Sequence, residues 1–387
     1  FSNMLKADWL SFGKLRAGWS SIAGGSDPYI RSTYASIDIP FTGSPIYSMP
    51  STANNPLIKP ELKTTKEIGL EASFFKNRFG FDVTLYDVKT NDLIIPLPID
   101  PANGYGFKRI KAGEMRNKGI EAMVNITPVK NSNLTWDMSW NFTKNKNELV
   151  ELQGDLQNYI LTNAPFRVQL AAQVGYAYGQ ILGTDFVYDA NGNKVVNSNG
   201  TYKASAIKPL GSILPDYNMG LRNTLRYKNL SLSFLFDMQE GGKYFSTSHM
   251  WGMYSGMLEE TALGGNREAG VILPGVKADG SPNDVVLDAA DWGGSFYSTV
   301  DAQNVFDASY IKLRDVTIGY DLPKSIIGNY LQGVRVSVFG RNLATWNLAW
   351  DGVDPENTAY GSGNIQGLEG GSLPSTRTFG FNVNFKF

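Results

Sequence analysis

The chain has 387 residues, and its 35 basic and 36 acidic side chains leave a formal net charge of −1. This balance excludes a strong electrostatic attraction to nucleic acid or to acidic partners. No run of about 18 or more apolar residues occurs, so the sequence contains no transmembrane helix. The absence of cysteine excludes disulfides and thiolate metal sites, and it fits a protein that faces the periplasm.

The beginning of the chain does not look like a natural start. The first residue is Phe1 rather than methionine, and no secretory signal follows it. A strand-like alternation of apolar and polar residues is already present at residues 14–19. We therefore expect a mature or truncated piece whose true N-terminus is missing.

Alternation with a period of two is the main structural signal in this sequence. Around residue 136, Leu134, Trp136 and Met138 alternate with Thr135 and Asp137. Such a pattern predicts a strand with one apolar and one polar face. Strands are predicted in this way at residues 14–19, 67–74, 79–85, 120–126, 134–142, 217–227, 230–238, 309–320, 334–341 and 377–387. No helical stretch of comparable strength appears, so the fold class is all-β.

Residues 377–387 carry the clearest alternation. Phe379, Phe381, Val383, Phe385 and Phe387 occupy every second position, with small or polar residues between them. In a soluble protein these side chains would need a second sheet to cover them. In an outer-membrane barrel, lipid covers the apolar side and the polar side lines the lumen. We therefore predict that this segment is a barrel-closing strand.

The lengths of the connections predict how the strands are arranged. Short turns, such as the one at residues 76–77, alternate with long connections at about 21–60, 91–106, 144–165 or beyond, 239–308 and 345–376. Outer-membrane barrels have this topology, with short periplasmic turns and long extracellular loops, and β-sandwiches do not. The fold is therefore predicted to be a transmembrane antiparallel β-barrel of about ten to twelve strands.

Two parts of this prediction stay open. The strand count depends on residues 144–216, where 174–189 and 194–203 form either a membrane hairpin or a folded external loop. In the strand at 309–320 the alternation changes phase near Arg314, which indicates either a bulge or a misplaced boundary.

Aromatic residues in the predicted loops are the candidates for contact with a substrate or a partner. Extracellular positions cannot belong to the aromatic girdles that mark the membrane surfaces. These side chains are predicted to pack a loop onto a partner or to line a substrate cavity. The candidates are Trp251, Tyr254, Trp292, Trp346 and Trp350.

The sequence offers little for catalysis, metal binding or cofactors. Its single histidine, His249, lies in the longest loop and is expected to be solvated or hydrogen-bonded rather than catalytic. Residues 189–193 (DANGN) supply oxygen ligands at alternate positions, but the glutamate of an EF-hand loop is absent. Their Asn-Gly pair favours a type I′ hairpin turn over a calcium site. We expect no enzyme activity, no cofactor and no metal.

Eight short stretches in order resemble the SusC/RagA family, the TonB-linked outer-membrane transporters of the Bacteroidota. Each stretch is weakly specific by itself, but the series covers nearly the whole chain. The stretches are WLSFGKLRAG (9–18), KPELKTTKEIG (59–69), YDVKTNDL (86–93), GEMRNKGIE (113–121), SYIKLRDVTIGYDLP (309–323), VFGRNLA (338–344), GVDPE (352–356) and RTFGFNVNFKF (377–387).

The resemblance implies a barrel of about 22 strands around an N-terminal plug, of which residues 1–387 would be the C-terminal part, without plug or TonB box. It also implies a location in the outer membrane, in contact with lipid and lipopolysaccharide. The partners it implies are a SusD-like surface lipoprotein, an N-terminal segment of the same transporter and the TonB-ExbB-ExbD complex. The implied function is import of an oligosaccharide or a peptide. The alternative is a self-contained small barrel that acts as an enzyme or an adhesin.

Overall fold

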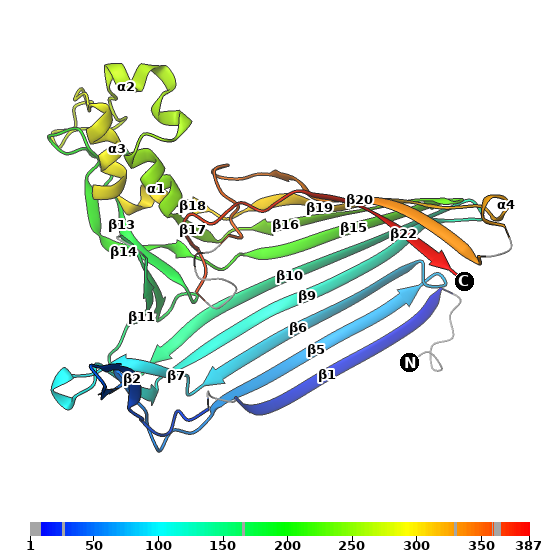
Figure 1. Ribbon diagram of the computed structural model, residues 1–387, viewed down its shortest axis with the longest axis horizontal. Helices are drawn as coiled ribbons and strands as arrows, with labels where there is room; N and C mark the ends of the chain where they lie inside the picture. The colour runs from blue at the N-terminus through cyan, green and yellow to red at the C-terminus, as the bar shows by residue number, and fades with distance from the viewer. Residues whose placement is uncertain (1–8, 25–27, 165–166, 329–330, 358, 360–364) are drawn as a thin grey trace.

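One antiparallel sheet of ten long strands dominates the computed structural model (Figure 1). The structure describes residues 9–24, 28–164, 167–328, 331–357, 359 and 365–387, so the expectation about Phe1 lies outside the described residues. The long strands follow one another across the sheet in chain order. They are β1 (Leu10–Gly24), β5 (Glu61–Phe74), β6 (Phe79–Asn91), β9 (Gly113–Lys130), β10 (Leu134–Leu152), β15 (Tyr217–Tyr227), β16 (Leu230–Glu240), β19 (Tyr310–Asp321), β20 (Gly333–Trp346) and β22 (Thr378–Lys386).

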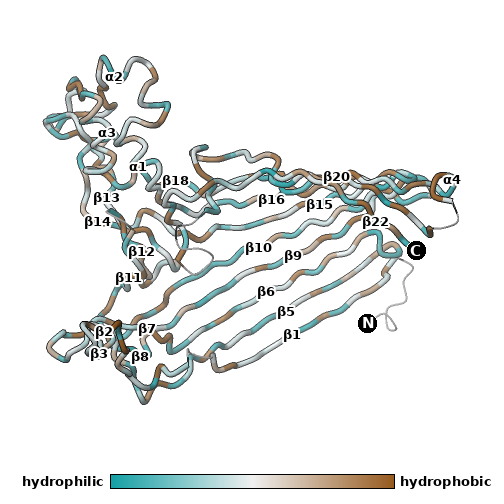
Figure 2. The backbone as a smooth tube through the Cα atoms, in the orientation of Figure 1, coloured by the Kyte–Doolittle hydropathy of each residue, from teal (hydrophilic) through white to brown (hydrophobic). Residues whose placement is uncertain are grey.

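The predicted alternation gives the sheet two different faces. Across β1 and β5, Leu15 lies opposite Leu70, whereas the next residue, Arg16, lies opposite Gly69 on the other face. Figure 2 shows the resulting change between hydrophilic and hydrophobic positions along each strand. The apolar face is bare, since Trp19 is 70% exposed and Phe381 is 78% exposed. A bare apolar face of this extent suits lipid rather than water.

The predicted closing strand is confirmed as a strand. Phe379, Phe381, Val383 and Phe385 lie in β22 and pair with β20, and Phe387 follows the last residue of β22. β22 forms one outer edge of the sheet and β1 forms the other. These two edges do not pair with each other in the described part of the chain, so its ten strands form an open wall and not a closed barrel. A self-contained barrel of these strands is therefore not what the structure shows.

The connections sort to the two ends of the sheet as predicted. One end carries four short connections, at 75–78, 131–133, 228–229 and 322–332, the last of which holds α4 (Lys324–Ile327). The other end carries five long ones, at 25–60, 92–112, 153–216, 241–309 and 347–377. Several predicted boundaries are wrong, because β10 continues to Leu152 and β20 to Trp346 by pairing with β9 and β19.

The phase change near Arg314 is a bulge in β19. Leu313 pairs with Ala344 of β20, but the next pair joins Asp315 to Arg341. The pairing of β19 with β16 shifts at the same place. The strand is therefore continuous, and the bulge gives the rim end of β19 a different set of inward residues from the membrane part.

The open question at residues 144–216 has a clear answer. Residues 153–216 and 241–309 fold together beyond the end of the sheet, and we call this unit the external subdomain (Figure 1). Leu170, Ile181, Phe245 and Met250 are fully buried at its centre. The region is thus a folded external layer and not a membrane hairpin, which sets the number of long strands at ten. Its apolar residues are covered by protein, which is why they need no lipid.

The external subdomain has two small sheets and three short helices. One sheet contains β11 (Asn158–Asn163), β12 (Gln169–Gln173), β13 (Gln180–Phe186) and β14 (Ala204–Ser212). The other contains β17 (Lys243–Ser246), β18 (Val305–Asp307) and β21 (Leu368–Glu369), the last from the 347–377 connection. The helices are α1 (Thr247–Tyr254), α2 (Asn266–Ala269) and α3 (Ala289–Ser298), with 3-10 turns at Glu259–Thr261, Leu263–Gly265 and Asp301–Asn304.

The first two long connections carry separate small elements. These are β2 (Ser36–Phe41), β3 (Ser44–Ser48), β4 (Thr52–Ala53), β7 (Ile94–Pro98), a 3-10 turn at Pro101–Asn103 and β8 (Phe107–Lys111). β2 pairs with β3, and β8 lies between β4 and β7. No helix in the described part of the chain is long and apolar enough to cross a membrane.

A buried polar side chain, Asn223, lies on the apolar face of the sheet. Asn223 in β15 is only 4% exposed, and it is the neighbour of Met138 across the β10–β15 pair. The indole Nε1–H of Trp136 donates a hydrogen bond of 3.1 Å to its Oδ1. Trp136 therefore both covers the amide and satisfies its acceptor, which lets a polar group lie on this face.

We expect Trp136→Phe to lower the free energy of unfolding by about 1–3 kcal/mol, because it leaves a buried amide oxygen without a donor. Trp140→Phe is the matched control, since Trp140 lies on the same strand and face and stacks on Phe142. Adding Asn223→Leu to Trp136→Phe should recover most of the loss. Urea unfolding of the complete transporter in detergent would measure all four proteins. Equal losses for the two tryptophan substitutions would contradict the role of this bond.

Candidate functional site

The polar face of the sheet is lined by paired charges. Arg16 in β1 donates to Asp82 in β6 at 3.0 Å. Looser pairs join Arg226 to Asp137 at 3.8 Å, Arg335 to Asp321 at 3.2 Å and Arg222 to Asp315 at 3.9 Å. Because these arginines each have a carboxylate within about 4 Å, their charges give this face no strong field of one sign.

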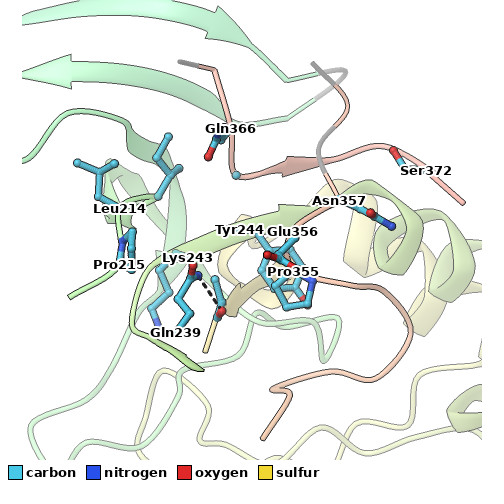
Figure 3. A pocket seen from close by; sticks show the side chains of 13 residues that line it. Leu214, Pro215, Gln239, Lys243, Tyr244, Pro355, Glu356, Asn357, Gln366 and Ser372 are labelled. Atoms are coloured by element: carbon cyan, nitrogen blue, oxygen red, sulfur yellow. Dashed lines mark hydrogen bonds between the residues drawn. The ribbon is translucent and has the colours of Figure 1, made fainter. Parts of the chain in front are cut away.

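Two cavities lie where the top of the polar face meets the external subdomain. The larger has a volume of about 440 Å³, and its lining includes Gln239, Lys243, Tyr244, Glu356, Asn357, Gln366, Gly367 and Ser372 (Figure 3). The smaller, of about 330 Å³, is lined by residues of β9, β10 and the external subdomain. Both are lined by Ile213, Leu214 and Gln366, so they are adjacent and form one candidate site.

Three asparagines, Asn117, Asn145 and Asn147, form the wall of the smaller cavity, and we call them the amide cluster. Asn145 Nδ2 donates to Asn117 Oδ1 at 3.0 Å, and Asn147 Nδ2 donates to the same oxygen at 2.8 Å. Tyr86 Oη donates to Asn145 Oδ1 at 3.2 Å. These bonds hold the three amides in one orientation.

A glycine makes room for this arrangement. Gly119 lies beside the amide cluster in β9, and any Cβ there would overlap the hydroxyl of Tyr86 and the backbone carbonyl of Lys144. A larger residue would therefore displace the tyrosine from Asn145. This glycine is the seventh residue of the GEMRNKGIE stretch. The lack of space for a side chain explains why the stretch has a glycine at this position.

Tyr244 lines the larger cavity, and its hydroxyl is buried and unpaired. The residue is 2% exposed, and in the described part of the chain its Oη has no hydrogen-bond partner. Burial, with the nearby carboxylates of Glu369, Asp307 and Asp354, raises the pKa of this phenol, so it keeps its proton. A buried hydroxyl without a partner is unusual in a folded protein, because most buried polar groups are hydrogen-bonded.

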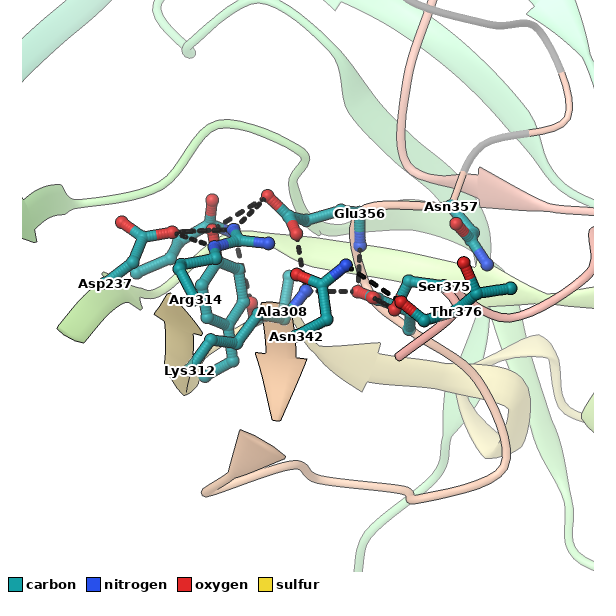
Figure 4. A network of polar contacts seen from close by, with 12 residues as sticks. Asp237, Ala308, Lys312, Arg314, Asn342, Glu356, Asn357, Ser375 and Thr376 are labelled. Carbon is teal, nitrogen blue, oxygen red and sulfur yellow. Dashed lines mark hydrogen bonds and ion pairs between the residues drawn. The ribbon is translucent and has the colours of Figure 1, made fainter. Parts of the chain in front are cut away.

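A charged network fixes the last long connection to the rim of the sheet (Figure 4). Lys312, which is buried at the end of β19, donates to Asp354 at 2.6 Å and also contacts Glu356. Arg314, the bulge residue, donates to Glu356 at 2.6 Å and to Asp237 of β16 at 2.8 Å. The bulge therefore directs Arg314 toward the GVDPE stretch. Pro355 and Glu356 of this stretch line the larger cavity.

Burial alone would raise the pKa of the Glu356 carboxyl, but the hydrogen bonds from Arg314 and Lys312 outweigh it. The pKa falls from its usual 4.5 to about 2. Hydrogen bonds from Lys312 and Ser375 likewise outweigh the burial of Asp354 and lower its pKa. Both carboxylates stay ionised at any physiological pH, so the network is permanent under those conditions.

A second anchor joins the same connection to the external subdomain. Glu369 in β21 is 1% exposed, and its carboxylate accepts hydrogen bonds from the hydroxyls of Ser246 and Ser248, both at 2.7 Å. Backbone N–H groups of Ser248 and Gly371 complete its shell at 3.1 Å and 2.6 Å. These donors compensate for the desolvation of the carboxylate. The 347–377 connection is thus held at both sides of the cavity.

The aromatic candidates from the sequence lie elsewhere. Trp251 stacks on Tyr297 with ring centres 5.1 Å apart, and Tyr254 is half exposed beside it. Trp292 packs against a core cluster of the external subdomain, and Trp350 stacks on Phe306 at 5.5 Å. Trp346 is not in a loop, because β20 continues through it and places it 6.3 Å from Phe236 on the apolar face.

None of these five aromatic residues lines either of the two cavities. Contact of these five residues with a substrate or a partner stays a prediction. The residues that do line the cavities were missed, although one signal was present. Asn145 and Asn147 alternate with lysines in the run TKNKN, which puts both amides on the polar face of a strand. The sequence does not show what stands opposite that face.

His249 is buried and held by neighbours. Its Nδ1 lies 2.9 Å from Asn304 Oδ1, its Nε2 lies 3.3 Å from Glu260 Oε1, and the rings of Phe306 and Trp350 cover it. The expectation of a hydrogen-bonded histidine is confirmed. It lines neither cavity, and the hydroxyl of the nearby Ser246 donates to Glu369 rather than to the imidazole.

The stretch 189–193 is a turn that closes a hairpin. Tyr188 pairs with Lys194, and Gly192 N donates to Asp189 O at 3.2 Å. The Asp189 carboxylate accepts from the side chain and backbone of Asn193 and from the backbone of Asn191, which lowers its pKa. Only Gly192 has a positive φ, 83°, so the predicted hairpin is right and the type I′ assignment is wrong. Among the described residues, no cluster of acidic or histidine side chains could hold a metal ion.

The chain is similar in sequence to known proteins of one family. The model of the TonB dependent receptor-like β-barrel matches residues 6–343. The chain belongs to this family. It is 29% identical to TonB-dependent receptor P3 of Formosa agariphila, an alignment that covers 86% of this chain and 35% of the relative. It is 25% identical to TonB-dependent receptor SusC of Bacteroides thetaiotaomicron over 100% of this chain and 38% of that relative.

The fold has a counterpart among solved structures. The RagAB peptide transporter superposes with a TM-score of 0.78 at 22% identity, covering 100% of this chain and 42% of the solved one. The resemblance to the SusC/RagA family is thus confirmed, and the ten-stranded sheet is part of an outer-membrane β-barrel. This TonB-dependent receptor chain spans between about a third and two-fifths of the length of these relatives.

The Glu356 network yields a pH prediction. Because the folded-state pKa of about 2 lies below the usual 4.5, the stabilisation is complete above pH 4.5 and is lost as the pH falls toward 2. We expect pepsin to cleave the 347–377 connection of the intact receptor slowly near pH 4.5 and faster near pH 2. Glu356→Gln should be cleaved fast at both values, and Asp351→Asn, which alters an exposed carboxylate of the same connection, should behave like the wild type. Equal cleavage of all three would refute the anchor.

Proposed function

We propose that this chain forms the C-terminal wall and part of the extracellular entrance of a TonB-dependent importer. Its cargo would be an oligosaccharide or a peptide. The observation that carries the proposal is the position of the two cavities. They lie between the polar, lumen-facing side of β9, β10 and β16 and the external subdomain, so a molecule bound there is already at the mouth of the passage.

The open edges of the sheet support a wall within a larger barrel. The outer edge strands β1 and β22 leave unpaired backbone groups next to bare apolar side chains, an arrangement that lipid does not tolerate. Strands from another segment of the same transporter would satisfy both edges. In this proposal that segment also supplies the plug, which links the transporter to the TonB-ExbB-ExbD complex.

The paired charges of the polar face suit this role. A wall with few unpaired charges lets a plug rearrange and a neutral or mixed cargo pass without trapping either one. Transport of this kind needs no bond breaking by the wall itself. Energy would come through the plug, and capture would belong to the external subdomain together with a SusD-like lipoprotein that covers it.

An enzyme or an adhesin is the alternative class. An enzyme would need a nucleophile or an acid–base pair beside a cavity, and His249 lies away from both cavities. An adhesin would work without energy from the inner membrane. The importer differs from both in its dependence on TonB.

The test combines composition with energy dependence. The tagged transporter, purified from outer membranes in mild detergent, should carry a plug-bearing segment and a separate lipoprotein in equal amounts. Cells without TonB should bind the nutrient that depends on this transporter but not take it up. Isolation of a single folded species of 42.5 kDa, or uptake that persists without TonB, would overturn the proposal.

A further inference from the structure

The outward, apolar face of the sheet becomes charged near the end that carries the long connections (Figure 1). The last apolar level on three neighbouring strands is formed by Ile68 of β5, Leu85 of β6 and Ile120 of β9, which lie directly opposite one another. Ile68 and Leu85 are exposed, so this level is bare. Because side chains alternate along a strand, the next outward positions lie two residues farther toward the long connections.

Those next positions are rich in lysine. Lys66 of β5 and Lys118 of β9 lie on either side of Asp87 of β6. Lys146 of β10 lies opposite Lys118, and Lys144 lies two residues before it on the same face. All four lysine side chains are exposed, and we call Lys66, Lys118, Lys144 and Lys146 the outer lysines. They border directly on the apolar part of the face.

The carboxylates near the outer lysines do not neutralise them. On this face, at this end of the four strands, they are Asp87, Glu114, Glu148 and Glu151. Asp87 accepts hydrogen bonds from Arg116 at 2.9 Å and 2.5 Å, and Glu114 pairs with Lys89 at 2.6 Å. Among the described residues, no carboxylate lies within ion-pair distance of an outer lysine. This part of the face therefore carries free positive charge.

The free positive charge is local. At the same end of β15, β16, β19 and β20, the outward residues are Tyr217, Met238, Glu240, Ile311 and Trp346. At the opposite end of β5, β6, β9 and β10, they are Phe74, Phe79, Ile126 and Met138. Neither set contains a lysine or an arginine. A group of lysines on neighbouring strands at one end indicates a partner that binds there, and not a general attraction of strand ends to the membrane surface.

The spacing of this surface defines the partner. Its apolar part must cover the level of Ile68 and Leu85, and its anionic groups must lie about 7 Å farther along the strands, the length of two strand residues. Lys66 and Lys146 are three strand spacings apart, or about 14 Å, so one anionic group cannot reach both. Lysine stems lie along apolar surface while their ammonium groups reach such anions. The partner is therefore an amphiphile with at least two anionic groups.

We propose that the outer lysines bind the phosphates of an acylated glycolipid of the outer leaflet, the lipid A part of lipopolysaccharide. Its acyl chains cover the apolar level below. One phosphate lies between Lys118 and Lys146, and a second phosphate, at the other end of the sugar backbone, lies near Lys66. Charge-assisted hydrogen bonds from ammonium groups to phosphate oxygens hold both. This surface is on the lipid side of the sheet, so its occupation does not depend on import.

Two other occupants fit less well. A phospholipid with a single phosphate would contact one end of the group and leave either Lys66 or Lys146 without an anion. An acidic protein segment would bring carboxylates but no acyl chains, so it would not cover the apolar level beside the lysines. A glycolipid with two phosphates meets both requirements in one molecule.

The test variant combines Lys118→Gln with Lys146→Gln, because it removes two neighbouring charges without breaking an ion pair of the described chain. Its thermal stability in detergent should equal that of the wild type. The matched control combines Lys14→Gln with Lys63→Gln, at two exposed lysines on the polar face of β1 and β5. Both variants change the net charge equally, so a difference between them reports the outward surface.

The complete transporter would be stripped of lipid in mild detergent and titrated with diphosphorylated lipid A, the same lipid without phosphates, and phosphatidylglycerol. The wild type and the control should bind diphosphorylated lipid A. The test variant should bind it about 25-fold more weakly, since each lysine near an anionic lipid contributes about a fivefold change. Removal of the phosphates should weaken binding to the wild type at least as much, and added salt should weaken it too.

Equal affinity of the wild type and the test variant, or tight binding of lipid A without phosphates, would overturn the inference. So would phosphatidylglycerol that binds as tightly as lipid A, or inorganic phosphate that displaces lipid A at constant ionic strength, because a single phosphate would then suffice. If the test variant kept lipid A but lost a protein partner or a second copy of the transporter, the surface would belong to a protein.

Discussion

Everything in this structure depends on the pairing of backbone groups inside a lipid layer. Within hydrocarbon, an unpaired N–H or C=O has no water to bind, so a chain that crosses as strands must stay in register from rim to rim. The ten long strands form nine neighbouring pairs, five of them without a shift in register, and the long irregular connections lie at the ends. The bulge in β19 lies toward the rim end of that strand, where Arg314 donates a hydrogen bond to Glu356 of the last connection.

That constraint explains why the external part of the chain folds as it does. Long connections leave the same end of the sheet, and their apolar residues cannot use lipid as cover. They cover one another instead, so Leu170, Phe245 and Leu368 from three different connections share one core. The external subdomain therefore forms because several long connections leave the sheet at the same rim. The two cavities lie between this subdomain and the polar face of the sheet.

The 347–377 connection links these parts into one site. It is held on one side by the buried Lys312 with the bulge residue Arg314, and on the other by the buried carboxylate of Glu369. Each anchor joins segments that are more than forty residues apart in the sequence. Together the anchors fasten the connection to both the wall and the external subdomain. A site between them can be stiff although it is built mostly from connections rather than strands.

The amino-acid sequence by itself determined the strands, their two faces and the side to which each connection belongs. Side chains in a strand alternate with a fixed period, so Trp136 and Phe381 could be placed on the apolar face, and the phase change at Arg314 could be located, without any tertiary information. The family resemblance also followed from local stretches.

The tertiary structure decided what meets across space. Residues 144–216 could not be assigned from their pattern, because a strand covered by protein and one covered by lipid alternate in the same way. The unpartnered hydroxyl of Tyr244, the cluster of Asn117 with Asn145 and Asn147, and the place of Trp346 depend on long-range neighbours. The aromatic candidates of the sequence analysis line neither of the two cavities, whose walls carry amide and aliphatic side chains. The two cavities form between segments that are far apart in the sequence. A local sequence pattern therefore cannot predict which residues line them.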